Sequence, residues 1–451
     1  MKEDTLNLLH CPDCNSAIEL RKVYNKIDNE YIDAVVGCDC TEYPILDGIL
    51  IYKKPSSHDG MSSTAYLIER MKAGYPKDAK ALPLKRESIE NSLLNLHIFL
   101  SSLGPLRRSI SPILTLVRRR KRRLYDKLTN KLSFFDIIDM MEPNTWGDYL
   151  KHRFSSQTLW SLYPFIHMIE RKDDRVLDLG CGAGHASFIL SKHIKPQNLV
   201  CADENYTMLF LAKKIMVKDA NFICMDANNP LPFSKDTFSS IIMMDSFHYV
   251  SNRAQLAREC ERILKQNGAL LLLHLHNALK ENISRGYPLS PSAWSALFKD
   301  LNTCIVPESH LIEDFMQKSE LDLTKKYNDE IINNADAISI AGTLDDELIG
   351  KYENLDQYIK KMQNPIINPI YDFTRNKDKI MLKRNPPNDV FLTEYPLTKK
   401  FLPEKYSVPY EISKTLKGRK VGISRDMLQK NKTFYDMIRK FIIIDSPKGY
   451  V

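Results

Sequence analysis

Three closely spaced glycines follow an aliphatic run in the segment from Arg175 to Leu190, RVLDLGCGAGHASFIL. The run predicts a buried strand, the glycines predict a tight turn, and Ala186 to Leu190 predict the start of a helix. Glycine is needed where the backbone must approach a ligand without a Cβ in the way, and the first N–H groups of a helix can face the negative end of that ligand. We therefore expect a cofactor at this turn, directly after Asp178. The glycines are Gly180, Gly182 and Gly184.

The spacing of this turn differs from that of a dinucleotide-binding fold, because His185 stands where the third glycine of G-x-G-x-x-G is required. The next aliphatic segment, Asn198 to Ala202, predicts a second strand and is followed by Asp203, 21 residues after Gly182. A carboxylate at this strand end can accept hydrogen bonds from both hydroxyl groups of a ribose. Nothing in the pattern requires a phosphate contact.

The glycine turn and the segments after it resemble the class I S-adenosylmethionine (SAM)-dependent methyltransferases of the methyltransferase-11 type. Five segments in the order of that family, over about 110 residues, carry the resemblance, which implies a Rossmann-like sheet that binds SAM. The resemblance also implies that Asp226, after the third strand, contacts the adenine amino group and that the N–H of Ala227 contacts the ring. Ser239 departs from the family pattern, because an aspartate is usual at this position after Phe238. The predicted cofactor-binding residues are Asp178, Gly180, Gly182, Gly184, Asp203, Asp226, Ala227 and Asp245.

Histidines follow the predicted fourth and fifth strands, where ligands of such sheets bind. A histidine near the transferred methyl group could take a proton from a hydroxyl group or an acidic carbon of the acceptor. We predict His248 and His276 as the catalytic residues. Strand alternation makes His274 point the same way as His276. Two alternatives remain open: the histidines hydrogen-bond loop backbone, or they form a metal pair for which the sequence offers no clear third ligand.

Four of the nine cysteines lie in the first 40 residues, as one C-x-x-C pair and one C-x-C pair. Two such pairs, 23 residues apart, can place four thiolates around one tetrahedral zinc ion. The flanking sequence resembles the zinc-ribbon family that includes the small activator subunit of eukaryotic methyltransferases. Four cysteine ligands leave no position for a substrate, so we expect a structural zinc. Its predicted ligands are Cys11, Cys14, Cys38 and Cys40.

We predict an α/β chain with four parts. Residues 1–55 form the zinc ribbon, and residues 56–132 form a linker with a basic helical segment. Residues 133–300 form the Rossmann-like SAM methyltransferase domain, and residues 301–451 form a C-terminal α+β extension that caps the sheet or shapes the substrate pocket. The 451 residues are enough for two or three domains.

The formal charge of +8 is modest and is concentrated in part in the run from Arg118 to Arg123. This run predicts either a surface for RNA, acidic lipid or a phosphorylated substrate, or a solvated helix face beside a core-packing helix. No stretch is long and apolar enough to predict a membrane span, and the N-terminus lacks the apolar core of a secretion signal. We therefore expect a cytoplasmic protein.

Three functions fit these features. We favour methyl transfer from SAM to a small-molecule, lipid or sugar acceptor. An rRNA or tRNA methyltransferase that binds RNA through the ribbon and the arginine run is the alternative, but Met244-Asp245-Ser246-Phe247 stands where enzymes that methylate base amines carry (D/N/S)-P-P-(Y/F/W). The third is a scaffold or regulator without catalysis, against which the intact glycine turn and aspartates argue.

Overall fold

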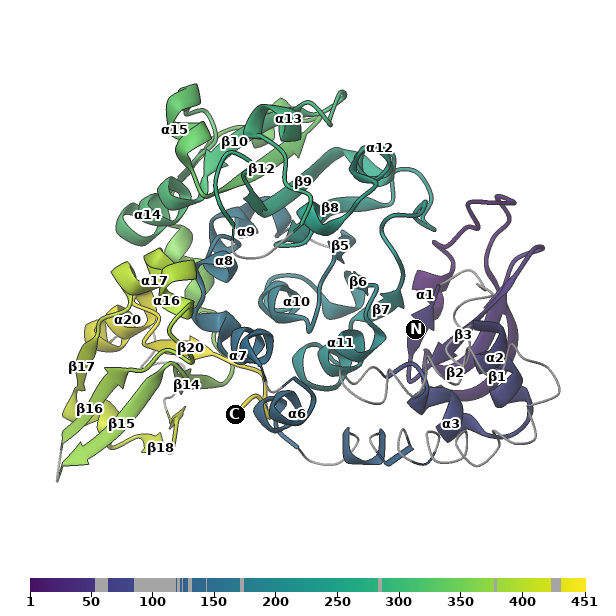
Figure 1. Cartoon of the computed structure of the whole chain (residues 1–451), viewed down its shortest axis with the longest axis horizontal. Coiled ribbons are helices and arrows are strands. Elements are labelled where there is room, and N and C mark those ends of the chain that lie inside the picture. The colour runs from purple at the N-terminus through teal and green to yellow at the C-terminus, as the bar shows by residue number, and fades with distance from the viewer. Residues whose placement is uncertain are drawn as a thin grey trace.

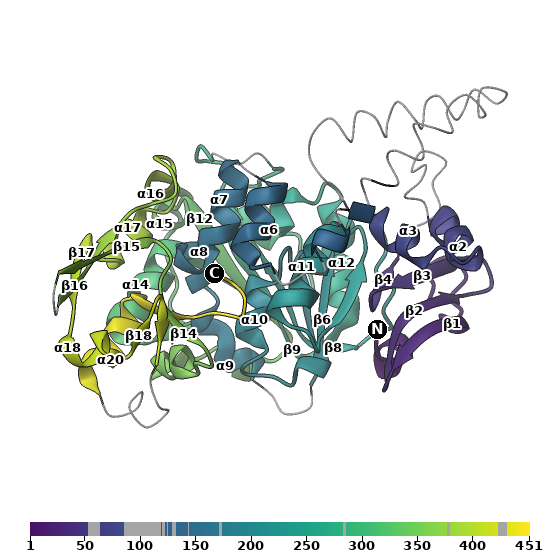
Figure 2. The same cartoon turned by 90° about the horizontal axis from the view of Figure 1, so that it is seen from below.

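The computed structural model of the chain describes residues 1–52, 64–84, 119, 122, 123, 125–128, 132–142, 144–170, 174–282, 286–376, 379–422 and 431–451. Its main element is an eleven-stranded sheet in the order β1-β2-β3-β4-β7-β6-β5-β8-β9-β12-β10 (Figure 1). The N-terminal strands lie at one end of the molecule, and the small C-terminal strands β15 to β18 lie at the other (Figures 1 and 2).

Seven strands form the Rossmann-like centre of this sheet: β5 to β9, followed at one edge by β12 and β10. The strands β5 to β9 run parallel, and they are apolar along most of their length because helices cover both faces. The chain proceeds outward from β5 to β7 and then returns to β8 on the other side of β5, which creates the crevice at the carboxyl ends where such sheets bind ligands. The parallel strands are β5 (Val176–Leu179), β6 (Leu199–Asp203), β7 (Asn221–Cys224), β8 (Phe238–Met244) and β9 (Leu264–His276).

The sheet continues beyond residue 300, where the sequence analysis ended the domain. Strand β12 (Ala337–Thr343) pairs antiparallel with β9, and β10 (Asn302–Pro307) pairs antiparallel with β12. Every residue of β12 is buried, because this strand lies between two others and under helix α14 (Glu308–Lys318). Strands β10 and β12 therefore extend the central sheet into residues that the sequence analysis assigned to the C-terminal extension.

Two hydrophobic clusters lie on opposite faces of the sheet. Along β9, Leu271 and Leu273 belong to one cluster and Leu270 and Leu272 to the other, as expected for side chains that alternate along a strand. On the first face pack α6 (Phe134–Met141), α7 (Thr145–His152), α8 (Gln157–Trp160), α9 (Ile166–Ile169), α10 (His185–Leu190) and α11 (Tyr206–Leu211). On the second face pack α12 (Arg253–Ile263) and α13 (Pro291–Ser295).

The N-terminal residues form a small antiparallel sheet that is joined edge to edge to the central one. Strand β4 pairs in parallel with β7, so that Ile49 lies beside Phe222 and Ile51 beside Cys224. The N–H of Tyr52 continues the ladder by donating to the carbonyl of Cys224 at 2.8 Å. The elements are α1 (Glu3–Leu6), β1 (Glu19–Ile27), β2 (Glu30–Gly37), β3 (Glu42–Leu46) and β4 (Ile49–Ile51).

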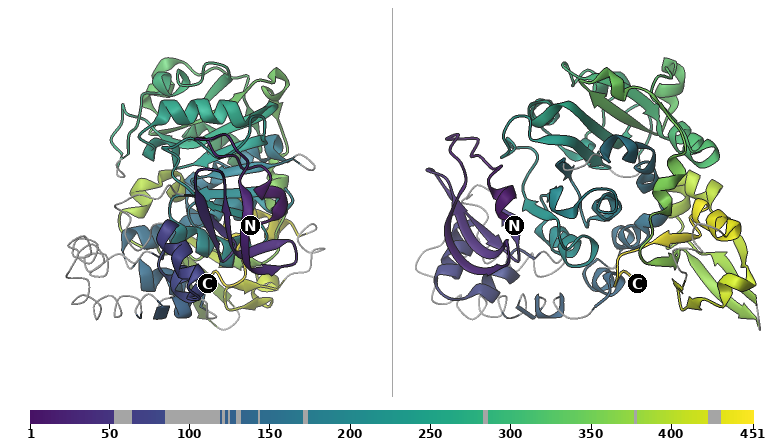
Figure 3. Two further views of the ribbon diagram at one scale, coloured as in Figure 1. Left: turned by 90° about the vertical axis from the view of Figure 1, so that its right-hand side faces the viewer. Right: turned by 180° about the vertical axis from the view of Figure 1, so that it is seen from behind.

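The C-terminal residues add three small sheets and several short helices (Figure 3). Strands β15 (Tyr371–Asn376) and β16 (Lys379–Arg384) pair antiparallel, and residues 377 and 378 between them lie outside the described part. The remaining strands are β11 (Leu321–Asp322), β13 (Lys351–Tyr352), β14 (Pro365–Ile367), β17 (Lys405–Val408), β18 (Leu416–Lys417), β19 (Lys420–Val421) and β20 (Ile443–Asp445). The helices are α15 (Asp329–Asn334), α16 (Phe391–Glu394), α17 (Pro396–Phe401), α18 (Tyr410–Ser413) and α20 (Lys432–Arg439).

Most of the predicted linker and part of the basic run lie outside the described residues. Of the run, Arg119, Arg122 and Arg123 are described. Arg122 donates from Nε to Asp78 Oδ1 at 3.0 Å, and Arg70 donates to the same carboxylate at 2.7 Å. This carboxylate lies in α3 (Pro76–Ala81), which follows α2 (Thr64–Lys72). Within the described residues, no helix combines the length and the apolar character that a membrane span needs.

Candidate functional site

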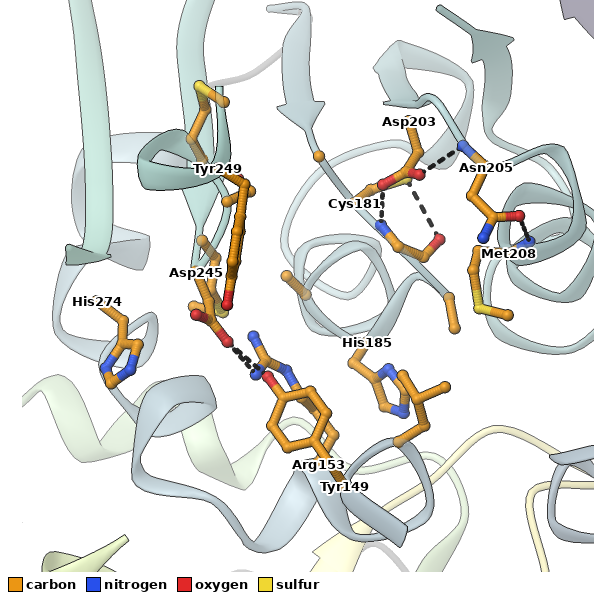
Figure 4. A pocket seen from close by; sticks show the side chains of 18 of the residues that line it. Tyr149, Arg153, Cys181, His185, Asp203, Asn205, Met208, Asp245, Tyr249 and His274 are labelled. Carbon is orange, nitrogen blue, oxygen red and sulfur yellow. Dashed lines mark hydrogen bonds and ion pairs between the residues drawn. The ribbon is translucent and has the colours of Figure 1, made fainter. Parts of the chain in front are cut away.

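A cavity of about 700 Å³ lies at the carboxyl ends of the parallel strands. Its walls come from the strand ends, from α7 and from residues 388–395 of the C-terminal part. Figure 4 shows the two ends of this cavity, with Asp203 at one and Asp245 at the other. Part of the C-terminal region, within residues 388–395, therefore lines the same cavity as the glycine turn.

The predicted glycine turn forms the floor of one end. Gly180, Gly182 and Gly184 have φ angles of +76°, +52° and +85°. A Cβ added at Gly182 would have no heavy atom within 4 Å, so the backbone here is exposed to the cavity. Gly184 does not line the cavity; a Cβ there would lie 2.8 Å from that of Ala212, so this glycine allows close packing of α10 against the next helical segment.

Asp203 connects this turn to the following helix. Its Oδ2 accepts the N–H of Gly182 at 2.8 Å, and its Oδ1 accepts the N–H of Asn205 at 2.8 Å. Asn205 in turn caps α11 with its side chain. The carboxylate is therefore held by two backbone donors at the position that the sequence predicted for a ribose contact.

Asp178 supports the turn from below. It is 1% exposed, and its Oδ2 accepts a hydrogen bond from Ser187 Oγ at 2.5 Å. Burial raises the pKa of Asp178 to about 6, although the Ser187 hydrogen bond acts in the opposite direction. Asp226 and Ala227 line the cavity next to Asp203, and the N–H of Asn228 donates to Asp226 at 2.9 Å.

The other end of the cavity is organised around Asp245. Its Oδ2 accepts hydrogen bonds from the Tyr149 hydroxyl at 2.6 Å and from Arg153 Nη1 at 2.8 Å. Its Oδ1 faces two imidazoles, with His248 Nε2 at 3.7 Å and His276 Nε2 at 4.0 Å. Burial alone would raise the pKa of this carboxyl group, but the charge of Arg153 and the three nearby imidazoles together outweigh it, so the pKa lies below the usual value.

The two histidines predicted as catalytic occupy different positions. His276 lines the cavity, whereas His248 lies behind it with the two rings stacked at 3.7 Å between centroids. Burial lowers the pKa of His248 to about 3 and that of His276 to about 4, so both imidazoles are neutral near pH 7. Of the two, only His276 lines the cavity.

His274 also lines the cavity, although it was not predicted as catalytic. Its Nδ1 lies 2.8 Å from Glu308 Oε1. Burial lowers the pKa of His274, but the negative charge of Glu308 and its hydrogen bond outweigh that effect, so the pKa lies above the usual value. A β-bulge occurs here, because the pairing of β9 with β12 shifts between Ile338 and Ile340 and His274 has a φ of +54°.

Aromatic side chains form the walls between the two ends. Tyr149 of α7 stacks on Tyr395 with ring centroids 6.0 Å apart, and Phe391 packs against Tyr395. Trp146, Tyr149 and Arg153 also line the cavity, whereas Phe154 is buried outside it. The aromatic wall from residues 391–395 had no signal in the sequence.

The four N-terminal cysteines form a compact cluster at the tip of the N-terminal sheet. Cys40 Sγ lies 3.5 Å from Cys11, 3.3 Å from Cys38 and 3.6 Å from Cys14. A disulfide requires about 2.05 Å between sulfurs, whereas four thiolates at 2.3 Å from one tetrahedral zinc ion lie about 3.8 Å apart. The spacing fits a zinc site and excludes disulfides between these pairs.

Comparison with known families identifies the central part of the chain. Residues 177–272 match the family described as methyltransferase domain. The chain contains a methyltransferase domain. This match spans β5 to most of β9 and includes the glycine turn, Asp203, Asp226 and Asp245.

The curated relatives of this methyltransferase domain cover only part of the chain. A demethylmenaquinone methyltransferase of Thermotoga maritima is 29% identical over 158 residues, which are 35% of this chain and 62% of that protein. A chloroplastic 2-methyl-6-phytyl-1,4-hydroquinone methyltransferase of Oryza sativa is 27% identical over 154 residues, 34% of this chain and 42% of that protein. The chain thus spans less than two thirds of the length of either relative.

Among solved structures, a complex that contains the Haloferax volcanii Trm112 methyltransferase activator matches with a TM-score of 0.35 and 19% identity, over 47% of this chain and 98% of that one.

Proposed function

We propose that this chain is a class I SAM-dependent methyltransferase whose acceptor is a small molecule with a planar ring and an ionisable oxygen. The observation that carries the proposal is that one cavity joins the glycine turn and Asp203 to the end that contains Asp245 and His276. A cofactor and an acceptor bound at the two ends would be adjacent, and methyl transfer depends mainly on such alignment.

The residues at the first end suit SAM. The open backbone at Gly182 allows close approach, and the carboxylate of Asp203 offers charged acceptors to the ribose hydroxyls. Asp226 and Ala227 line the adjacent wall, where the family resemblance places the adenine ring. When bound, SAM supplies an electrophilic methyl group. Asp245, which was predicted to bind the cofactor, is tied to Tyr149 and Arg153, and we propose that it acts on the acceptor side.

The acceptor end suits an aromatic ring. Tyr149, Phe391 and Tyr395 line it, and aromatic pairs favour stacked or edge-to-face contact with a planar acceptor. The names of the two curated relatives, which refer to menaquinone and hydroquinone chemistry, support the same class. We propose that His276 contacts the acceptor and that His248 positions His276 through the stacked rings.

We also propose that Cys11, Cys14, Cys38 and Cys40 hold one structural zinc ion. The thiolates would complete its tetrahedral shell, so the zinc would fold the N-terminal sheet and take no part in methyl transfer.

The test uses the purified chain, methyl-labelled SAM, a set of hydroquinones and fractionated extract of the source cell. We expect label in the small-molecule fraction, and no label with an Asp203→Ala variant. Label in RNA would overturn the proposal. An RNA-binding role of the arginine run would then have to be reconciled with the hydrogen bond that Arg122 already donates to Asp78. A folded protein that fails to bind SAM would indicate a scaffold or regulator.

A further inference from the structure

The acceptor end of the cavity gathers histidines around one oxygen of Asp245. One donor atom each from Asp245, His274 and His276 lies within 4.8 Å of the other two. Two imidazoles and one carboxylate are a donor set typical of divalent first-row transition metals. We propose that these three residues bind a divalent transition-metal ion, such as Zn²⁺ or Fe²⁺, which in turn binds an oxygen of the acceptor.

The carboxylate of Asp245 is oriented for this role. Tyr149 and Arg153 both bind its Oδ2, and they fix the direction in which Oδ1 points. Hydrogen bonds of this kind to a metal-ligating carboxylate are part of most metal sites. Oδ1 is the oxygen that faces the imidazoles, so the available ligand atom is aimed at the histidines and not at the bulk solvent.

His274 has the carboxylate partner that metal-bound histidines usually have. Its Nδ1 lies 2.8 Å from Glu308 Oε1, and Glu308 is 2% exposed and accepts a second hydrogen bond from Gln157 at 3.1 Å. This contact fixes the ring and leaves Nε2 as the nitrogen for a metal. A carboxylate–histidine–metal arrangement orients the ring and increases the basicity of the ligand.

Some ring nitrogens of the buried imidazoles have no hydrogen-bond partner among the described residues. Among the described residues, His276 Nδ1 and both ring nitrogens of His248 are buried without a hydrogen-bond partner. Buried polar atoms of this kind are rare, and a bound ion or water is a common partner for them. Three such nitrogens within one stacked pair of rings indicate that the local hydrogen-bond network is incomplete without a further species.

The backbone is strained at two of the proposed ligands. Asp245 and His274 have φ angles of +55° and +54°, which side-chain-bearing residues rarely adopt. His274 lies at the bulge in β9, and retained strain of this kind is concentrated at functional sites. The distances are close to those required: ligand atoms at about 2.1 Å from one metal lie about 3.0–3.4 Å apart, and Oδ1 of Asp245 is 4.0 Å from His276 Nε2.

Three protein ligands leave coordination positions that face the cavity. An acceptor hydroxyl bound there would lose its proton to water more readily, and the resulting oxygen anion would stay bound to the metal as the nucleophile or as part of a delocalised one. This role rests on the proposed methyl transfer, whereas metal binding itself does not.

The test measures metal stoichiometry on the full chain, freed of metal and titrated with Co²⁺ in the absence of SAM. We expect two equivalents. One has the thiolate-to-cobalt charge-transfer band of the cysteine site, and the other has only weak ligand-field bands. In a His274→Ala, His276→Ala double variant we expect the first equivalent alone, and His310→Ala, a histidine outside the cavity, should keep both.

Affinity gives a second measure that does not require the double variant to fold. Glu308→Gln should weaken the second equivalent by about 10–100-fold and leave the cysteine site unchanged, because Glu308 acts through His274. A wild-type protein that binds one equivalent only, or a folded double variant that still binds two, would overturn the metal site. The proposed function is tested separately. A protein that binds SAM and transfers methyl groups without the second metal would uphold the proposed function and refute the metal site. A protein that binds the second metal but not SAM would uphold the metal site and refute the proposed function.

Discussion

Replacing Asp203 with alanine should remove most of the affinity for SAM. The carboxylate already accepts the N–H groups of Gly182 and Asn205, so it is held at the end of β6 with no need for the ligand to order it. We expect two further hydrogen bonds, from the ribose hydroxyls. A hydrogen bond to a charged group contributes about 1.5–3 kcal/mol. The half-buried position favours the lower figure, so two bonds amount to about 3 kcal/mol, or more than about 100-fold in dissociation constant.

Isothermal titration with S-adenosylhomocysteine, the product, measures this affinity without turnover. Asp219→Ala is the matched control, since Asp219 is an exposed aspartate between β6 and β7 that lies outside the cavity. The thermal midpoint of each variant without ligand is needed as well, because Asp203→Ala also removes the acceptor of two backbone donors and should lower stability by roughly 1–3 kcal/mol.

A folded Asp203→Ala variant with unchanged affinity would refute the reasoning at a defined step. It would show that the strand end of β6 does not present the ribose-binding carboxylate, even though the carboxylate is fixed beside the glycine turn. A loss of affinity that Asp219→Ala reproduces would instead indicate a general effect of charge.

Three further predictions concern other parts of the molecule. Cys14→Ser, or a zinc chelator, should release one zinc equivalent and speed amide exchange in β7, because β7 pairs with β4 of the N-terminal sheet. Equal exchange rates with and without metal would argue against a role of the zinc in folding this sheet. Tyr395→Leu should raise the KM for the acceptor by about 3–10-fold and leave SAM affinity unchanged, since it removes one aromatic contact of about 0.5–1.5 kcal/mol; a parallel loss of SAM affinity would contradict the division of the cavity. His185, whose pKa is lowered to about 3 by burial and by the charge of Arg153, is protonated more readily when unfolded, so its contribution to stability is lost as pH falls from about 6.5 toward 3. His185→Gln should therefore reduce the loss of unfolding free energy between pH 8 and pH 5 by about 2 kcal/mol, as measured by urea titration at both values.

The cofactor end of the cavity could be predicted because its residues are local to strand ends. The glycine turn follows one apolar strand, and an aspartate stands at the end of each of the next two strands. When these strands pair in parallel, the turn and the aspartates are brought to the same edge of the sheet. The acceptor end depends instead on contacts between residues far apart in sequence. Asp245 meets Tyr149 and Arg153 more than 90 residues away, and only the structure places Asp245 beside His274 and His276 as the third possible ligand that the sequence did not offer. No periodicity in residues 388–395 indicated that they would reach the same cavity.

The position of the N-terminal sheet relates the cysteine site to cofactor binding. Within the described residues, none from 1–52 lines the cavity, so this sheet has no direct contact with an acceptor there. Its strand β4 is paired along β7, and β7 leads directly into Asp226 and Ala227. A metal bound by the four cysteines would therefore stabilise, through β4, the strand whose end forms the proposed adenine wall. Loss of that metal should weaken SAM binding before it changes the KM for the acceptor, because the acceptor end is held by α7, β9 and the C-terminal residues.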